Sequence, residues 1–383
     1  MDDKKNKVLN VPTLRFAEYT DEWHKYALSD FATRITRRNK NNESSLPLTI
    51  SAQYGLVDQI TFFNKTVASV DLSGYYLLYN GDFAYNKSYS NDYAWGAVKR
   101  LDKYEKGCLS SLYFVFRPTD KVDSDYLTHY FETSKWHKGI SNIAGEGARN
   151  HGLLNMAVDD YFATKHYLPS LSEQKKIACF LNLITKRIEI QNKIISKYET
   201  LIKGISYYII KKFNGKAYKL GTLAEIYQPQ TITKTDLPDN GKYPVYGANG
   251  IIGYYDRFNH KESQIMITCR GSTCGTVNLS TPFSWITGNS MVINIDEHKS
   301  IVDKKYLYYY LKTQSFNDLI SGSGQPQIVR KPLARLNVFL PEISQQIKLR
   351  KIIDTFEKTL KNEKEMLSAL QKQKAFLLQT MFI

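Results

Sequence analysis

The sequence predicts an α+β fold in which two domains of mixed strands and short helices stand in tandem, each followed by a long helix. The chain has 383 residues, a length typical of more than one domain. A short segment recurs at an offset of 172 residues (340 − 168), and an apolar seam follows each copy. The seam has a 3.5-residue period, which is typical of supercoiled helices, so we expect the two helices to form a coiled coil.

The repeated segment marks the junction between a domain and its helix. Proline cannot donate to a β-ladder, so Pro169 and Pro341 each end an extended stretch. Ser170 or Ser172 in the first copy, and Ser344 in the second, are candidate N-caps. The two copies read Leu-Pro-Ser-Leu-Ser-Glu-Gln-Lys-Lys at residues 168–176 and Leu-Pro-Glu-Ile-Ser-Gln-Gln-Ile-Lys at residues 340–348.

Both predicted helices are about 39 residues long, or roughly 58 Å at 1.5 Å per residue. Nine of the ten seam positions agree in polar or apolar character, and the polar interruption at Gln191 recurs as Glu363. Two matched seams at one offset favour pairing of the helices with each other over packing of each on its own domain. The seams are Ile177, Leu181, Ile184, Ile188, Gln191, Ile195, Tyr198, Ile202, Ile205 and Ile209, and Leu349, Ile353, Phe356, Leu360, Glu363, Leu367, Leu370, Lys374, Leu377 and Met381.

Further anchors recur before each helix. Residues 125–130 resemble residues 305–310, a short helix in either copy, and glycine turns follow at residues 145–147 and 322–324. Between these anchors the halves differ, which indicates one scaffold with two divergent middles. The predicted divisions are residues 1–167 for the first domain, 168–215 for the first helix, 216–339 for the second domain and 340–383 for the second helix.

The composition favours a basic cytoplasmic protein. Lys and Arg number 52 against 37 Asp and Glu, so the formal charge is +15, which suits nucleic acid but fits a merely basic soluble protein equally well. No signal peptide is visible, and no apolar run approaches the ~18 residues of a membrane span. No second cysteine pair completes a zinc site, so we expect reduced thiols at Cys108, Cys179, Cys269 and Cys274.

Signatures of catalysis are missing from the sequence, so we expect neither a catalytic site nor a cofactor. No Pro-Pro dipeptide occurs, and none of the 11 prolines follows Asn, Asp or Ser, as an adenine methyltransferase loop requires. A phosphate-binding Gly-x-x-x-x-Gly-Lys-Ser/Thr loop and a His-Glu-x-x-His zinc helix are also absent. The nearest nuclease-like trace is Asp239 with Glu297 and Lys299, and these residues fall in polar, loop-like stretches that favour surface charges.

The order of these phrases resembles the specificity subunit of type I restriction–modification systems over essentially the whole chain. That resemblance implies two target-recognition domains whose helices pack antiparallel. It also implies partner methyltransferase (modification) subunits and a motor–nuclease (restriction) subunit. The first domain departs from the pattern, because Tyr-Tyr-Leu-Leu-Tyr-Asn-Gly-Asp at residues 75–82 stands in place of a counterpart of residues 243–250. The phrases are Arg15-Phe16 followed by Trp23, Tyr-Pro-Val-Tyr-Gly-Ala-Asn-Gly at 243–250, Gly-Gln-Pro-Gln-Ile at 324–328, and both helix starts.

The predicted function is therefore recognition of a bipartite, interrupted site in double-stranded DNA, with each domain reading one half-site. Three alternatives remain open at this point. A stand-alone DNA-binding protein would purify without a methyltransferase. A metal-dependent nuclease using Glu297 and Lys299 would cleave DNA by itself. A coiled-coil scaffold bound only to protein leaves the basic charge and the divergent middles unexplained.

Candidate DNA-contacting residues follow from side-chain chemistry in polar or glycine-flanked stretches. Arginine and lysine can pair with phosphates, while arginine, asparagine and glutamine can read base edges in the major groove. Glycine allows close approach of the backbone to a ligand. We expect Arg270 and Ser272 at a hairpin turn between two apolar strands. The candidates are Arg34, Arg37, Arg38, Lys40, Arg149 and Asn150 in the first domain, and Tyr246, Asn249, Arg270, Ser272, Gln325 and Gln327 in the second.

Overall fold

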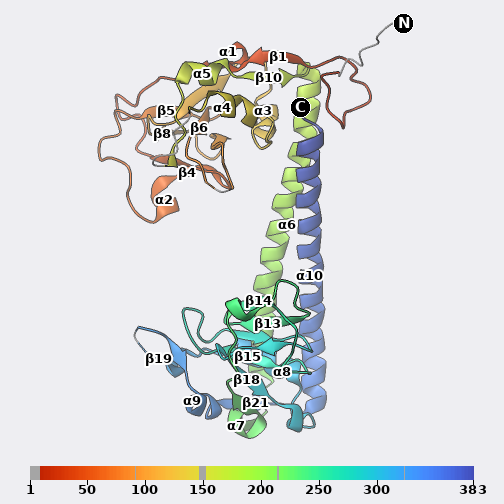
Figure 1. Ribbon diagram of the computed structural model, residues 1–383. Helices are drawn as coiled ribbons and strands as arrows, with labels where there is room; N and C mark the ends of the chain where they lie inside the picture. Colours follow the sequence, from red (N-terminus) through yellow and green to blue (C-terminus); the bar gives the residue numbers. More distant parts are fainter. Residues whose placement is uncertain (1–8, 91, 146–151, 214, 323) are drawn as a thin grey trace. The chain divides into compact units, whose positions relative to one another are not determined.

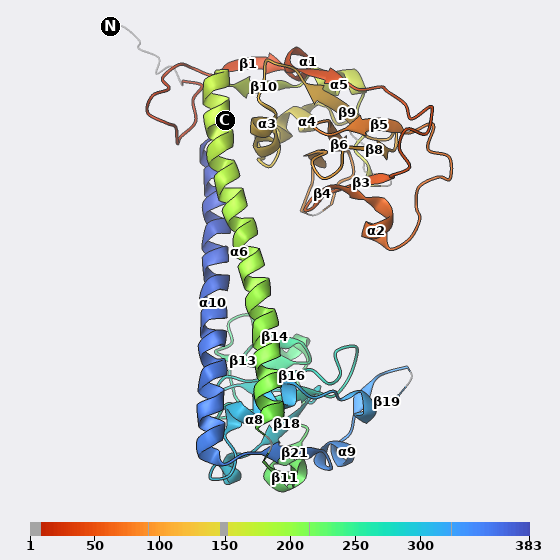
Figure 2. The same cartoon turned by 180° about the vertical axis from the view of Figure 1, so that it is seen from behind.

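The computed structural model describes residues 9–90, 92–145, 152–213, 215–322 and 324–383 (Figures 1 and 2). The chain divides into two compact units, the first made of Met1–Ile190 with Met366–Ile383 and the second of Gln191–Glu365. Two long helices, α6 (Leu171–Lys212) and α10 (Ile343–Thr380), contribute one segment each to both units. The units cut both helices, so the divisions drawn from the sequence at residues 167, 215 and 339 stay predictions.

A four-stranded antiparallel sheet with the order β2-β9-β6-β7 forms the centre of the first unit. Successive side chains of a strand point to opposite faces, so Phe83 and Tyr85 join the main core under the helices while Ala84 joins a smaller core on the other face. Both faces are thus covered. The sheet strands are β2 (Ala32–Arg34), β9 (Phe114–Pro118), β6 (Phe83–Asn86) and β7 (Ala97–Arg100).

Shorter elements surround this sheet. They are the strand pairs β1 (His24–Ala27) with β10 (Lys165–Leu168), β3 (Leu48–Ser51) with β4 (Gly55–Asp58), and β5 (Tyr76–Tyr79) with β8 (Lys106–Leu109). The helices are α1 (Leu28–Phe31), α2 (Gln59–Phe63), α3 (Ser124–Tyr130), α4 (His137–Ile143) and α5 (Val158–Ala163).

The second unit repeats the central sheet with the order β12-β18-β15-β16. Its β15 side chains alternate in the same way, because Ile265 and Ile267 join the main core while Met266 joins a smaller one. The sheet strands are β12 (Glu225–Tyr227), β18 (Ser290–Asn294), β15 (Ile265–Thr268) and β16 (Val277–Leu279).

What surrounds the second sheet differs from the first unit in the middle of the domain. There β14 (Gly250–Tyr255), β13 (Tyr243–Gly247) and β17 (Trp285–Ile286) form a three-stranded sheet in which β13 and β17 run parallel. The remaining strands are β11 (Lys216–Lys219) with β21 (Asn337–Leu340), and β19 (Ile320–Ser321) with β20 (Gln327–Ile328). The helices are α7 (Leu220–Leu223), α8 (Lys304–Lys312) and α9 (Arg330–Ala334), with 3-10 turns η2 (Lys234–Asp236), η3 (Asp296–His298) and η4 (Asn317–Leu319).

The predicted α+β fold with two helix-terminated domains and an antiparallel helix pair is confirmed. Every predicted seam position on α6 and α10 is buried or half-buried. In the first unit the start of α6 packs with the end of α10, since Ile177 and Leu377 share one core. In the second unit the end of α6 packs with the start of α10, since Ile209 and Leu349 share another.

The polar interruption of the seam meets its own repeat equivalent. Gln191 Nε2 donates to the backbone oxygen of Glu363 at 3.1 Å and to its carboxylate at 2.5 Å. Gln191 is 8% exposed, so both partners gain a hydrogen bond where an unpaired amide would be costly.

The glutamine of the repeated segment explains why that segment recurs. Gln174 Nε2 donates to Pro169 O at 2.9 Å while its Oε1 accepts from Asp123 N at 2.8 Å. Gln346 does the same with Pro341 O at 2.8 Å and Asp303 N at 2.9 Å. Asp123 and Asp303 in turn cap α3 and α8. Each buried glutamine therefore ties the start of a long helix to a short helix of the same domain.

Candidate nucleic-acid interface

In the second unit, the turn after β13 is tied to the loop after β15. The buried Thr268 donates from Oγ1 to Ala248 O at 2.6 Å, and Thr273 donates from Oγ1 to Asn249 Oδ1 at 2.6 Å. Gly250 adopts a φ of +103°, which only glycine takes readily and which the tight β13–β14 turn requires. These contacts place Asn249 next to the loop of residues 269–276.

A third segment, residues 325–328, joins the same place. Gly271 N donates to Pro326 O at 3.0 Å, and Ile328 N donates to Cys269 O at 3.1 Å. Arg270 and Gln327 are paired across this bridge, so they lie side by side. We call residues 248–250, 269–276 and 325–328 together the second-domain loop cluster. The hairpin turn expected for Arg270 is present, because β15 and β16 pair antiparallel on either side of the loop.

The second-domain loop cluster presents hydrogen-bonding side chains to solvent. The predicted residues Asn249, Arg270, Ser272, Gln325 and Gln327 all belong to it and are all exposed. Arginine matches the two acceptors of guanine, and the amide of asparagine or glutamine matches the acceptor and donor of adenine. The cluster therefore has the chemistry to read base edges.

Tyr246 differs from the rest of the predicted set. It lies in β13 rather than in a loop, and its ring is only 8% exposed, packed with Met266 and Val292. Its hydroxyl oxygen accepts from Thr281 N at 3.1 Å. The contacts of Tyr246 thus support the sheet beneath the loops, and DNA contact by its side chain stays a prediction.

Sequence reasoning did not single out the residues that hold these loops in place. Thr268 and Thr273 are two of them, and Gln228 is a third, since its Nε2 donates to Gly288 O at 3.0 Å. Burial raises the pKa of the neighbouring Cys269 thiol, so that side chain stays a neutral packing group. None of these residues belongs to a motif that could have marked it.

The basic segment of the first unit is organised by one buried carboxylate. Asp82 is fully buried and accepts from Arg37 Nη2 at 2.8 Å and from Arg117 Nε at 2.6 Å. The Arg37 guanidinium also lies 4.2 Å from the centre of the Tyr79 ring. Both arginine side chains remain partly exposed, at 34% and 44%. Arg117 was not predicted, because its partnership with Arg37 arises only through Asp82.

The other first-domain candidates divide between this place and elsewhere. Arg34 is exposed at the end of β2, Arg38 lies over the Tyr76 ring at 4.4 Å, and Lys40 is exposed. Arg149 and Asn150 lie outside the described residues. The structure thus gathers Arg37 with Arg117 at the entry end of β6, where Asp82 precedes Phe83.

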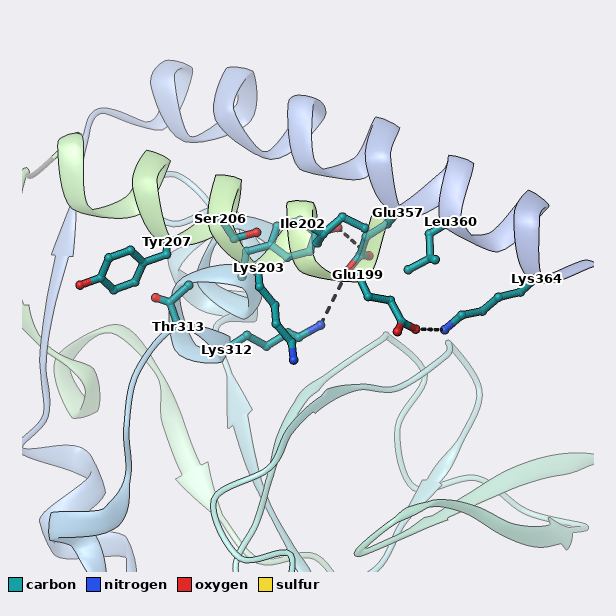
Figure 3. A pocket seen from close by; sticks show the side chains of 11 residues that line it. Glu199, Ile202, Lys203, Ser206, Tyr207, Lys312, Thr313, Glu357, Leu360 and Lys364 are labelled. Carbon is teal, nitrogen blue, oxygen red and sulfur yellow. Dashed lines mark hydrogen bonds and ion pairs between the residues drawn. The ribbon is translucent and has the colours of Figure 1, made fainter. Parts of the chain in front are cut away.

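A groove of about 700 Å³ lies between α6, α8 and α10 in the second unit (Figure 3). Lys364 Nζ lies 2.7 Å from Glu199, and Lys312 Nζ lies 3.7 Å from Glu357. The first unit has a groove of about 610 Å³ at the equivalent place. The offsets of 180 on the short helix and 172 on the long helices match Lys312 with Glu132, Thr313 with Thr133, Leu360 with Ile188 and Ile202 with Lys374.

Two searches bear on other classes of protein. In the part of the chain that is described, no three His, Cys, Asp or Glu side chains gather as a metal site would require. Lys299, from the nuclease-like trace, contacts Asp296 at 3.3 Å. No helix among the described residues has the length and apolar character needed to span a bilayer.

Comparison with known proteins gives one consistent family. Residues 214–372 match the family model of the type I restriction modification DNA specificity domain. The EcoprrI type I restriction enzyme specificity subunit of Escherichia coli is 28% identical over 152 residues, which are 39% of this chain and 37% of that subunit. A putative specificity subunit of Haemophilus influenzae is 28% identical over 125 residues, 32% of this chain and 31% of its own length. The matched stretches thus span about a third of these relatives.

Solved structures extend the likeness of fold to the whole chain. The S subunit of a type I restriction–modification system from M. genitalium has a TM-score of 0.59 at 17% identity, covering 97% of this chain and 99% of that one. A chain from a study of complex assembly and conformational transition of the type I system has a TM-score of 0.56 at 16% identity, covering 94% and 97%. The resemblance inferred from the sequence is confirmed.

Proposed function

We propose that this chain, a type I restriction–modification specificity subunit by family and by fold, is the non-catalytic subunit that reads DNA for a restriction–modification complex. One observation carries the proposal. The second-domain loop cluster gathers Asn249, Arg270 and Gln327, three exposed side chains suited to base edges, although they are far apart in the sequence.

Each recognition domain reads one half-site in this proposal. The two domains share a central sheet but differ in their middles, so the two half-sites have different sequences. Phosphate contacts from exposed Arg and Lys, such as Arg34 and Lys40, hold the duplex without reading its sequence. The continuous helices α6 and α10 act as the spacer, so unread bases separate the half-sites.

Methyltransferase subunits dock on the helices and domain flanks, and a motor–nuclease subunit joins them. The two equivalent grooves support this part of the proposal, because each combines an apolar wall with charged side chains (Figure 3). Lys203, Lys312 and Lys364 line the groove of the second unit beside Glu199 and Glu357, which suits a partner surface of mixed charge.

The test is a map of methylated bases in the source genome before and after deletion of this gene. We expect an asymmetric motif, interrupted by unspecified bases, to lose its methylation in the deletion strain. Reintroduction of the wild-type gene serves as the control. A continuous motif, or an unchanged methylation map, would contradict the proposal.

A further inference from the structure

The common strand order of the two central sheets matches residues between halves whose sequences there have diverged. Phe83 of β6 lies opposite Phe116 of β9, and Ile265 of β15 lies opposite Ile293 of β18. Phe83 and Ile265 are therefore equivalent, at an offset of 182 residues (265 − 83). The loop that follows β6 then corresponds to the loop that follows β15, and Ser88 takes the position of Arg270.

Backbone contacts beyond the sheets support this match independently. Leu154 N donates to Lys87 O at 2.9 Å, as Ile328 N does to Cys269 O at 3.1 Å. Tyr89 N donates to Gly152 O at 3.0 Å, as Gly271 N does to Pro326 O at 3.0 Å. Ser88 is bridged to Leu153, as Arg270 is to Gln327. All three correspondences have an offset of 182 in the loop and 174 in the facing segment.

We propose that residues 88–90 and 152–154 form the base-reading element of the first domain, which takes an edge of duplex DNA as the second-domain loop cluster does. This inference rests on the proposed function. Ser88 and Ser90 are exposed hydroxyls, and Leu153 is 38% exposed. The element was not visible in the sequence, because Ser88 and Leu153 are 65 residues apart (153 − 88) and belong to no motif.

The chemistry of the two elements differs at equivalent positions. Arg270 and Gln327 offer a guanidinium and an amide, whereas Ser88 and Leu153 offer a hydroxyl and an apolar surface. A hydroxyl serves either base of a pair, and an apolar side chain suits the methyl group of thymine. Leu153 therefore fits a thymine in the first half-site, and the two domains read different bases from one scaffold.

This assignment separates reading from the arginine pair of the first unit. Asp82, which holds Arg37 and Arg117, precedes β6, whereas Ser88 follows it. A four-residue strand spans roughly 13 Å at 3.3 Å per residue. The two groups thus lie at opposite ends of β6, and Arg37 is not part of the reading element.

The experiment uses the full chain assembled with its methyltransferase partners in the source host, with methylated bases mapped across the genome. The variant Ser88→Arg/Leu153→Gln installs the second-domain side chains, and Arg270→Ser/Gln327→Leu is its reciprocal. We expect each to change the bases required in one half-site, and the two variants to affect different half-sites. Ser88→Ala/Leu153→Ala is a smaller change that should relax the first half-site. Val70→Gln, at a fully exposed apolar residue outside both elements, is the control and should leave the motif unchanged.

The outcomes keep the two proposals apart. An unchanged first half-site in both variants of Ser88 and Leu153, with a changed second half-site in the reciprocal variant, would overturn this inference and leave the proposed function intact. Methylation that is indifferent even to deletion of the gene would overturn the proposed function itself. Thermal unfolding of each purified variant confirms that any loss of methylation reflects recognition rather than folding.

Discussion

Lys374 of α10 lies with its Nζ 2.8 Å from Glu132 in the first unit, whereas Ile202 and Lys312 occupy the equivalent positions in the second. Burial opposes the ionisation of Glu132, but the nearby His129 ring and the charges of Lys374 and Lys99 lower the pKa of Glu132 to about 2. In the second unit Ile202 joins the apolar core instead, and Lys312 pairs with Glu357. Lys374 is thus the one seam position whose polarity the repeat does not preserve.

This difference teaches that the two halves are not interchangeable partners. A second copy of the first half would bring Ile202 to the position of Lys374 and leave Glu132 without that partner. Two second halves would bring Lys374 towards Lys312, and like charges repel. The Glu132–Lys374 pair therefore favours pairing of unlike halves, as occurs within one chain.

The largest expected effect is from reversing one charge of this pair. Lys374→Glu places two carboxylates together, and we expect the free energy of unfolding to fall by about 3 kcal/mol. The double variant Glu132→Lys/Lys374→Glu should recover most of that loss, as measured by urea unfolding. A double variant no more stable than Lys374→Glu alone would show that the pair contributes little.

The second prediction concerns residues 1–215 expressed alone. Their exposed seam should bury itself in an antiparallel homodimer with the two Gln191 side chains near the axis, and with methyltransferase partners this dimer should modify an interrupted palindrome. Ile202→Lys should strengthen the dimer about tenfold, or about 1.4 kcal/mol, by restoring a partner for Glu132.

Light scattering and sedimentation measure this dimer, and Leu201→Lys, on the exposed face of α6, is the matched control. Equal strengthening by Leu201→Lys would refute the specific role of the charge. A stable monomer of residues 1–215 would show that the helix packs on its own domain and would refute the two-helix spacer.

The third prediction uses the pH dependence of the same pair. The folded-state pKa of Glu132 is depressed to about 2, so its contribution is present above the unfolded value near 4.5 and is lost as pH falls towards 2. The stability difference between wild type and Glu132→Gln should therefore shrink, by up to about 2 kcal/mol, between those pH values. Burial also lowers the pKa of His166 to about 4, which affects both proteins equally. A difference that does not vary with pH would contradict the assignment.

The fourth and smallest effect compares the two kinds of first-domain contact. Arg37→Ala/Arg38→Ala should weaken binding of the assembled complex to all DNA sequences and reduce the dependence of affinity on salt. Arg38→Ala alone leaves the Asp82 pair intact, so it separates phosphate contact from loss of stability. Affinity measured over a salt series, with unrelated DNA beside the target, is the readout. Loss confined to one base position would assign these arginines a reading role instead.

The helices and their seam could be predicted because a 3.5-residue pattern is local and long. The exposed candidates Asn249, Arg270 and Gln327 could be named from their residue types and flanking glycines. Their assembly could not, because it depends on which strands adjoin, as does the pairing of Arg37 and Arg117 through Asp82. Tyr246 shows the opposite limit, since a glycine-rich phrase resembled a loop although its first half is a strand.

The hydrogen bond between Gln191 and Glu363 has a consequence for the length of the DNA target. A slip of one heptad would set Gln191 against Phe356 or Leu370 and leave a buried amide unpaired. Such a slip is about 10 Å along the helix axis, close to the rise of three base pairs. This polar contact, remote from any base, would thus help to set the number of unread base pairs between the proposed half-sites.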